Sequence, residues 1–291
     1  MSDAQPIFRT MDILSRRRLQ ARHSQAEERL RPPMTPTLPI RPHLFSYWTE
    51  VSLLVHAARA IRLYLDFDGT LVDFRPRPNE VHMTGKTRTA LRRLLRHRCV
   101  QVAVVSGRRR TTLIRLVGLA GVKYMGLYGW EERPGCHIPN SVMQRLSGLR
   151  GGLRELPGKF PGIYLEDKRF SLAIHSRGVS DEMQKVARSH AKKLLRGLRD
   201  LHILRGEHIW EVVPGQIVGK GAVIRKELKG ANDATLPIYI GDDLTDEPAF
   251  AALPHGITVL VGAARPTKAR FRLRSPDEVR TFLTRLEAEL P

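Results

Sequence analysis

IRLYLDFDGT, residues 61–70, joins an apolar run to two carboxylates that stand two residues apart. The run 61–65 is typical of a buried strand. Asp66 and Asp68 follow it directly, and Gly69 permits a tight turn at that point. Taken alone, the segment is either a polar turn after a strand or a pair of carboxylates presented at a strand end.

Helical and strand-like patterns alternate through much of the chain. Continuous apolar runs such as 100–105 are typical of strands covered on both faces. Alternation of this kind predicts a parallel sheet with right-handed crossovers, in which ligands bind beyond the carboxyl ends of the strands. The other expected elements are helices near 86–97, 110–119, 219–229, 246–252 and from 276, and strands near 123–127, 236–240 and 258–261.

The pattern changes between residues 139 and 213, where two helical stretches and two pairs of short strands indicate an α+β insertion. We therefore expect a core at 46–138 and 214–291 and an inserted domain at 139–213. Residues 1–45 are polar, rich in Arg and then in Pro, and cannot bury enough apolar surface to fold. We expect them to form a disordered extension.

The chain is strongly basic, with 49 Lys and Arg against 29 Asp and Glu and a formal net charge of +20. This sign suits nucleic acid, an anionic membrane surface or an anionic small substrate. The basic residues spread along most of the chain rather than forming one stripe with interleaved aromatics, so no nucleic-acid partner is expected.

Cysteine usage and hydropathy indicate a soluble protein of a reducing compartment. Cys99 and Cys136 belong to no CxxC or Cys/His cluster, which argues against a disulfide framework or a zinc site. The most apolar segment, 51–65, contains charged residues, and no signal-like segment opens the chain. We expect a cytoplasmic protein without membrane contact. A monomer is compatible with the sequence, which leaves the oligomeric state open.

Two further motifs offer positive charge and hydrogen-bond donors. Ser106-Gly107-Arg108 follows the apolar run 100–105, and a hydroxyl with free backbone amides at a helix start makes a phosphate cradle. Lys220 stands between two glycines at the start of a helix, where its positive charge can oppose the charge of a phosphate and of an Asp that attacks it as a nucleophile. Each motif alone is also compatible with an ordinary turn.

An acidic cluster follows another apolar run. GDDLTDE, residues 241–247, carries four carboxylates within six residues. These repel one another unless basic partners or a hard cation compensate them, and magnesium prefers such oxygen ligands. The alternative is a helix N-cap cluster, a role that suits Asp246 and Glu247 in particular.

These motifs occur after predicted strands in a fixed order: the candidate nucleophile Asp66, the Ser106 hydroxyl, Lys220, and the acidic pair at 242–243. That order resembles the haloacid-dehalogenase-type phosphatases from about Arg62 to the end of the chain. The resemblance implies an α/β fold, with a Rossmann-like parallel-sheet hydrolase core and an inserted α+β cap, and an aspartyl-phosphate intermediate. It implies catalysis by Asp66 (nucleophile), Asp68 (acid, then base) and Lys220, phosphate binding by Thr70, Ser106, Gly107 and Arg108, and Mg2+ binding by Asp66, the Asp68 carbonyl and Asp242.

Finer features resemble the trehalose-6-phosphate phosphatases. They are 241–247, LEDK at 165–168 followed by SLAIHSR at 171–177, and Glu211 ahead of 219–221. In a strand, residues two apart share a face, so Glu166 lies with Lys168 and His175 with Arg177. The resemblance implies a mobile cap whose Glu166, Lys168, Arg177 and Glu211 hold the distal glucose of trehalose 6-phosphate. A solvated face of cross-strand pairs is the alternative.

The chain departs from the family pattern at two places. Arg169 and Phe170 follow Lys168 where the family usually shows a glycine, and Tyr128 replaces an expected histidine. These departures concern substrate fit more than the reaction. A phosphatase acting on another sugar phosphate by the same mechanism therefore stays open, as does a catalytically silent regulatory or nucleic-acid-binding protein.

Overall fold

The computed structural model describes residues 41–74, 81–133, 135–230 and 234–290. Residues 1–40 of the expected extension lie outside this part of the chain. Residues 41–45, which we expected to belong to the extension, instead lie against the core. Leu44 is fully buried, and the Arg41 guanidinium donates to the carbonyl of Thr267.

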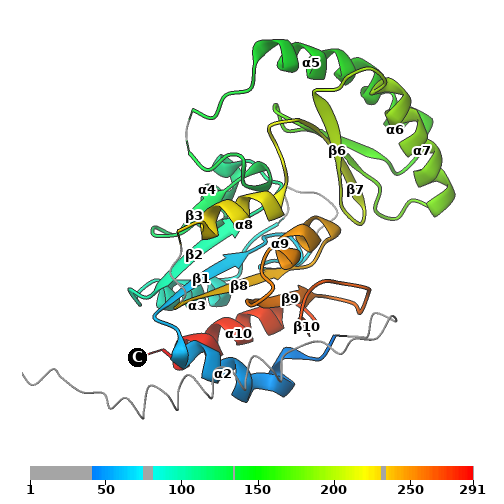
Figure 1. Cartoon of the computed structure of the whole chain (residues 1–291). Coiled ribbons are helices and arrows are strands. Elements are labelled where there is room, and N and C mark those ends of the chain that lie inside the picture. The colour runs from blue at the N-terminus through cyan, green and yellow to red at the C-terminus, as the bar shows by residue number, and fades with distance from the viewer. Residues whose placement is uncertain (1–40, 75–80, 134, 231–233, 291) are drawn as a thin grey trace, which may run out of the picture.

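A six-stranded parallel sheet forms the larger part of the molecule, in the order β10-β9-β8-β1-β2-β3 (Figure 1). Its central strand, β1, pairs with β2 and β8. Leu63 lies opposite Val102 on one side and Ile238 on the other. The strands are β1 (Ala60–Leu65), β2 (Val100–Val105), β3 (Lys123–Met125), β8 (Thr235–Gly241), β9 (Ile257–Val261) and β10 (Phe271–Leu273).

Helices cover both faces of this sheet, which explains its continuous apolar strands. Alternate side chains of a strand point to opposite faces. Leu63 and Leu65 therefore pack in the cluster that includes α2, α3, α4 and α10, whereas Tyr64 packs with α8 and α9. These elements are η1 (Leu44–Tyr47), α2 (Trp48–Ala57), α3 (Gly85–Leu94), α4 (Arg110–Val117), α8 (Lys220–Leu228), η4 (Leu244–Asp246), α9 (Glu247–Ala251) and α10 (Pro276–Ala288).

A second, antiparallel sheet lies over one end of the first, in the order β4-β5-β7-β6 (Figure 1). Ile174 and Val212 pack on one of its faces, in a cluster with the helices α5 and α7. Its other face includes Glu211 and turns toward the core. The elements are α5 (Asn140–Arg154), α6 (Leu156–Lys159), β4 (Tyr164–Asp167), β5 (Leu172–His175), α7 (Asp181–Leu194), β6 (Leu201–Arg205) and β7 (Ile209–Pro214).

The predicted fold class, a parallel-sheet core with an α+β insertion, is confirmed. Three details differ. The strand expected near 123–127 ends at Met125, and the 3-10 turn η3 (Leu127–Gly129) follows it. The helix expected at 246–252 is divided between η4 and α9, and β10 was not predicted because three residues give too short a pattern. None of the helices in the described residues is long and apolar enough to cross a membrane.

Candidate active site

The predicted catalytic residues meet at the carboxyl edge of the parallel sheet. Asp66 follows β1, Ser106 follows β2 and Asp242 follows β8. Because β1, β2 and β8 are neighbouring parallel strands, their ends lie at one edge. A pocket of about 230 Å³ opens between this edge and the second sheet. Its lining includes Asp66, Asp68, Ser106, Gly107, Arg108, Glu166, Lys168, Arg177, Lys220 and Asp242.

Lys220 is a buried cation held by two carboxylates. Its ammonium lies 2.9 Å from Asp66 Oδ1 and 2.7 Å from Asp246 Oδ1, and the side chain is only 2% exposed. Burial alone lowers the pKa of a lysine, but the charges of Asp246 and Asp66 outweigh it and raise the pKa of Lys220. The positive charge beside Asp66 is therefore retained at neutral pH.

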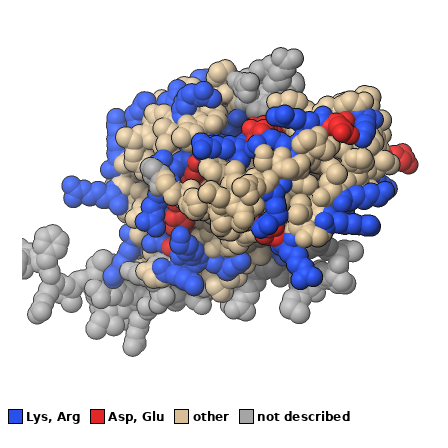
Figure 2. Space-filling view, turned by 90° about the horizontal axis from the view of Figure 1, so that it is seen from above, with Lys and Arg blue, Asp and Glu red and all other residues tan. Residues whose placement is uncertain are grey.

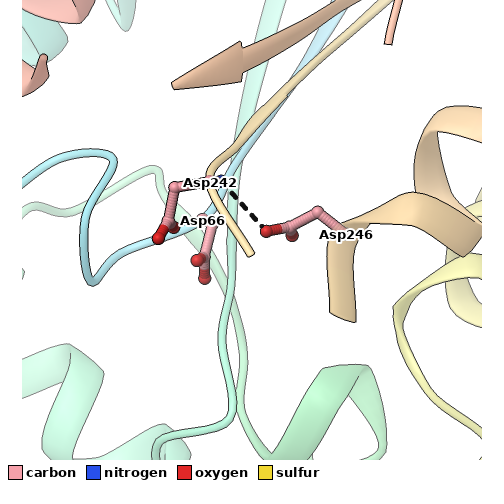
Figure 3. A group of neighbouring side chains, drawn as sticks. All are labelled: Asp66, Asp242 and Asp246. Carbon is pink, nitrogen blue, oxygen red and sulfur yellow. Dashed lines mark hydrogen bonds between the residues drawn. The ribbon is translucent and has the colours of Figure 1, made fainter. Parts of the chain in front are cut away.

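Asp66 and Asp242 are buried carboxylates that repel each other. Figure 3 shows them side by side, with Asp246 approaching from the other side. Burial, together with the neighbouring carboxylates, raises the pKa of Asp66 to about 7 although Lys220 opposes the shift. Burial and the charge of Asp66 likewise raise the pKa of Asp242 well above its usual range. One carboxylate oxygen from each of Asp66, Asp242 and Asp246 lies within 4.8 Å of the others.

Asp246 does more than cap a helix. Its Oδ1 accepts from Lys220 and from the hydroxyl of Tyr239, each at 2.7 Å. Its Oδ2 accepts from the backbone N–H groups of Asp242 and Asp243. These four donors occupy the acceptor positions of the carboxylate. Asp66 and Asp242 are therefore better suited than Asp246 to bind a cation. The helix N-cap role, which was the alternative interpretation of the sequence, accounts for the two backbone bonds. The sequence could not reveal that Asp246 also pairs with Lys220.

The turn after Asp68 packs tightly against Asp242. Gly69 has a φ of +77°, and a Cβ placed on it would lie 2.3 Å from Asp242 Oδ2. Glycine is therefore required both for the backbone conformation and for the close approach. The hydroxyl of Thr70, which is fully buried, donates to Asp242 Oδ1 at 3.3 Å. Thr70 thus contacts the acidic group beside the expected phosphate position.

Asp68 and Arg108 form a two-point ion pair. Nε and one terminal nitrogen of Arg108 donate to the two Asp68 oxygens, each at 2.7 Å. Arg108 also lies over the ring of Phe67. We expected Arg108 to hold phosphate, whereas in this structure it holds the carboxylate expected to act as acid and base. The hydroxyl oxygen of Ser106 accepts from the Arg108 backbone N–H at 3.2 Å.

Three of the four predicted sugar-binding residues line the pocket from the second sheet. Glu166 pairs with His175 at 3.0 Å. Burial acts to raise the pKa of Glu166, but the hydrogen bond from His175 and the nearby charge of Lys168 lower it below its usual value. The Lys168 ammonium lies 3.1 Å from the carbonyl oxygen of Gly107, in the core. The Arg177 guanidinium lies over the ring of Phe74.

Glu211 lies behind Lys168 instead of lining the pocket. It is fully buried, and its carboxylate accepts from the Lys168 ammonium at 2.7 Å, from the Tyr128 hydroxyl at 2.7 Å and from the Ser171 hydroxyl. Direct sugar contact by Glu211 stays a prediction. In the structure, its carboxylate forms an ion pair with Lys168.

Some lining residues were not predicted. Tyr128 and His208 line the pocket, as do Tyr164 and His175 of the second sheet. The alternation that pairs His175 with Arg177 was a usable signal for His175. Nothing local pointed to Tyr128 except its departure from the expected histidine.

The departure from the family pattern at Arg169 has a backbone explanation. Arg169 has a φ of +71°, in the left-handed region that favours glycine. Its N–H donates to Asp167 Oδ1 at 2.8 Å, and its guanidinium lies over the ring of Phe170. The backbone therefore keeps the turn for which the family usually has glycine, although the side chain has changed.

Comparisons with known proteins agree with this geometry. Residues 64–277 match the family model described as Trehalose-phosphatase. The chain is 34% identical over 252 residues to trehalose-phosphate phosphatase of Mycobacterium tuberculosis (strain H37Rv), covering 80% of this chain and 63% of that protein. It is 31% identical over 270 residues to probable trehalose-phosphate phosphatase 9 of Oryza sativa subsp. japonica, covering 80% and 72%. The chain thus spans less than two thirds of the mycobacterial relative's length.

Solved structures share the fold. The C-terminal domain of C. albicans trehalose-6-phosphate phosphatase aligns with a TM-score of 0.74 at 20% identity, covering 86% of this chain and all of that one. A trehalose-6-phosphate phosphatase related protein aligns with a TM-score of 0.64 at 26% identity, covering 78% and 97%. Since the family model matches most of the sequence, the chain belongs to the trehalose-phosphatase family.

Proposed function

We propose that this protein hydrolyses trehalose 6-phosphate to trehalose and phosphate, by a magnesium-dependent reaction through an aspartyl phosphate on Asp66. Membership of the family supports the substrate. The observation that carries the chemistry is Asp66 itself, a buried carboxylate at a strand end, 2.9 Å from a buried lysine and next to Asp242. A protein that only binds its ligand does not need two carboxylates and a lysine buried together, with raised pKa values.

The first step is attack by a carboxylate oxygen of Asp66 on phosphorus. The bond between phosphorus and the sugar oxygen breaks, and Asp68 donates a proton to that oxygen as trehalose leaves. Lys220 stabilises the negative charge that gathers between Asp66 and the phosphoryl group. Ser106, Thr70 and the backbone at Gly107 hold the phosphoryl oxygens.

The second step regenerates the enzyme. Asp68, now ionised, accepts a proton from a water molecule that attacks the phosphorus of the aspartyl phosphate. The phosphorus–oxygen bond to Asp66 breaks, which releases phosphate and restores the Asp66 carboxylate. In the structure, both Asp68 oxygens accept from Arg108. To transfer these protons, Asp68 must leave this pair or move together with Arg108.

The donor set fits a magnesium ion. Asp66 and Asp242 are buried carboxylates that repel each other, and their pKa values are raised. Among the described residues, Lys220 contacts Asp66 directly, and a bound cation would supply further positive charge beside the two carboxylates. These two carboxylates, with the main-chain carbonyl of Asp68, would hold the ion. Bound there, magnesium would neutralise charge between the nucleophile and the phosphate.

The second sheet has a role in this proposal as well. We propose that residues 139–213 act as a cap on a core of 46–138 and 214–291, and that Glu166, Lys168 and Arg177 bind the distal glucose, with Glu211 acting through Lys168. A closed cap excludes water from the reacting phosphate. A cytoplasmic protein without membrane or nucleic-acid contact stays a prediction from the sequence, which leaves the oligomeric state open.

The test is phosphate release from a panel of trehalose 6-phosphate, sucrose 6-phosphate, glucose 6-phosphate and an aryl phosphate, each with magnesium or with a chelator. We expect magnesium-dependent release with a marked preference for trehalose 6-phosphate. Preference for another member would keep the chemistry and overturn the sugar assignment. Absence of release from every member would overturn the catalytic proposal.

A further inference from the structure

Tyr128 occupies an unusual backbone position beside the phosphate-binding loop. Leu127 and Tyr128 have φ values of 47° and 61°, in the left-handed region that side-chain-bearing residues rarely adopt. Their N–H groups donate to the carbonyls of Arg108 and Ser106, both at 2.8 Å. The turn η3 is thus bonded at two points to the loop 106–108, and it presents the Tyr128 side chain at a defined place.

The ring of Tyr128 lies directly on that loop. A Cβ placed on Gly107 would lie 2.8 Å from Cζ of Tyr128 and 2.9 Å from its hydroxyl oxygen. Tyr128 is itself only 4% exposed. Gly107 therefore leaves room for the ring, and the ring in turn holds the loop from the side of the second sheet.

The hydroxyl of Tyr128 crosses from the core to the second sheet. It donates at 2.7 Å to Glu211 Oε2, the same oxygen that accepts from the Lys168 ammonium. Burial, reinforced by the charge of Glu211, raises the pKa of Tyr128 well above its usual value. The hydroxyl therefore stays protonated and remains a donor at any physiological pH.

These bonds close a ring of contacts around the pocket wall. Tyr128 rests on Gly107 and binds Glu211; Glu211 binds Lys168; and Lys168 donates back to the carbonyl of Gly107. Two contacts in this ring join the core to the second sheet, namely Tyr128 to Glu211 and Lys168 to Gly107. If the second sheet moved away from the core, both would break together.

We propose that Tyr128 is a positioning residue that stabilises the closed arrangement of the two sheets and fixes Lys168 for contact with the sugar, which makes it a determinant of preference for the disaccharide phosphate. This inference rests on the proposed function and deepens it. Tyr128 transfers no proton and need not touch the reacting phosphate. It acts by raising the fraction of protein in which Lys168 is in place.

The consequence differs between substrates. A ligand that needs the closed state binds with an apparent affinity reduced by the fraction of protein that is closed. A large sugar phosphate that contacts Lys168 would lose binding when the Tyr128 hydroxyl is removed. A small aryl phosphate that reaches only the core loop would lose little, because its contacts do not involve Lys168.

Tyr128→Phe tests this, because it removes the hydroxyl and keeps the ring on Gly107. We expect KM for trehalose 6-phosphate to rise about tenfold, as befits the loss of one hydrogen bond to a buried charge, with kcat changed by less than about threefold. We expect kcat/KM for the aryl phosphate to stay within about twofold. Tyr124→Phe is the matched control, because Tyr124 is also buried but, among the described residues, its hydroxyl bonds only to the backbone of Leu119. In this control, KM and kcat for trehalose 6-phosphate should stay unchanged.

A double-mutant cycle with Lys168→Met identifies the route of the effect. If Tyr128 acts through Lys168, Tyr128→Phe will raise KM much less when Lys168 is already Met. Effects that simply multiply would overturn the proposal, as would an equal loss on both substrates or an unchanged KM for the sugar phosphate. Failure of the proposed function is distinguishable, because the unaltered protein itself would then show no preference for trehalose 6-phosphate.

Discussion

Lys220 shows how one residue links stability to chemistry. A lysine that is 2% exposed must keep its charge compensated, and two carboxylates from different elements do so. Asp66 also needs Lys220, because burial raises the pKa of Asp66 to about 7 even with the ammonium beside it. Asp66, the proposed nucleophile, and the Lys220 ammonium are therefore mutually dependent.

Asp66→Asn should remove the nucleophile while keeping nearly the same shape. We expect turnover of trehalose 6-phosphate to fall at least about a thousandfold. The far-ultraviolet circular dichroism should be unchanged, because Lys220 retains Asp246 as a partner. Phosphate release with saturating magnesium measures the first effect. Asp73→Asn, an exposed change in the same loop, is the control and should leave activity intact. Turnover near that of the unaltered protein would contradict the role of Asp66.

Asp246→Asn should damage stability as well as activity. The amide has only one acceptor oxygen, so it cannot serve Lys220 and Tyr239 on one side and two backbone N–H groups on the other. We expect the free energy of unfolding to fall by about 3 kcal/mol, since one partner of a buried ion pair is neutralised. Urea denaturation measures this change. Asp277→Asn, which affects an exposed ion pair, should cost less than about 1 kcal/mol. An equal loss of unfolding free energy in the two variants would refute the role of Asp246 as a buried partner of Lys220.

The second sheet arranges its charged residues through strand register. Glu166 lies opposite Ala173, and Ala173 lies opposite Glu211 on the next strand. The three residues therefore form a row on the face turned toward the core, and the apolar residues of β5 and β7 pack on the helices behind. A slip of one residue in β4 would turn Glu166 away from the pocket.

Glu166→Gln should impair sugar binding more than chemistry. Gln keeps the size of the side chain but removes the charge that pairs with His175 and that we expect to accept sugar hydroxyls. KM for trehalose 6-phosphate should rise about tenfold, and kcat/KM for an aryl phosphate should stay within about twofold. Steady-state kinetics on both substrates provide the measurement. Glu182→Gln, an exposed change on α7, is the control. A parallel loss on both substrates would count against the cap assignment.

Over the whole molecule, the two sheets are joined by contacts on both sides of the pocket. On one side, Tyr128 and Lys168 connect the core loop with the second sheet. On the other, the Glu207 backbone N–H donates to Asp243 Oδ1 at 2.6 Å. Arg109 also lies over the ring of Phe170. The core and the second sheet are therefore in direct contact at several places around the pocket.

The net charge of +20 should assist capture of an anionic substrate. Figure 2 shows Lys and Arg side chains spread over the face seen from above, with small acidic areas between them. Raising ionic strength from about 20 mM to about 300 mM screens this attraction. We expect kcat/KM for trehalose 6-phosphate to fall by about threefold or more, and kcat by less than about twofold, at constant magnesium. Initial-rate measurements separate the two constants. A kcat that falls as steeply as kcat/KM would show that salt acts on the chemistry instead.

Much of the fold and of the catalytic edge was predictable from local patterns. Continuous apolar runs predicted buried parallel strands, and the polar residues that follow β1, β2 and β8 had to meet because parallel strands end at one edge. That rule places Asp66, Ser106 and Asp242 at one edge, and the strand order β8-β1-β2 makes them neighbours there. The strand β10 was missed because three residues give too short a pattern, and residues 41–45 were missed because their burial depends on neighbours distant in the chain.

Side-chain partners could not be predicted in the same way. Asp68 pairs with Arg108, Asp246 with Lys220, and Glu211 with Tyr128, across 40, 26 and 83 residues of sequence. Sequence periodicity tells which face of an element a side chain is on, but not which distant group comes within hydrogen-bond reach of it. Local sequence motifs therefore predicted which functional groups lie at the carboxyl edge of the sheet. Which carboxylate stays available, and which is neutralised, depends on long-range packing, because a buried charge must take the partner that the packed elements bring to it.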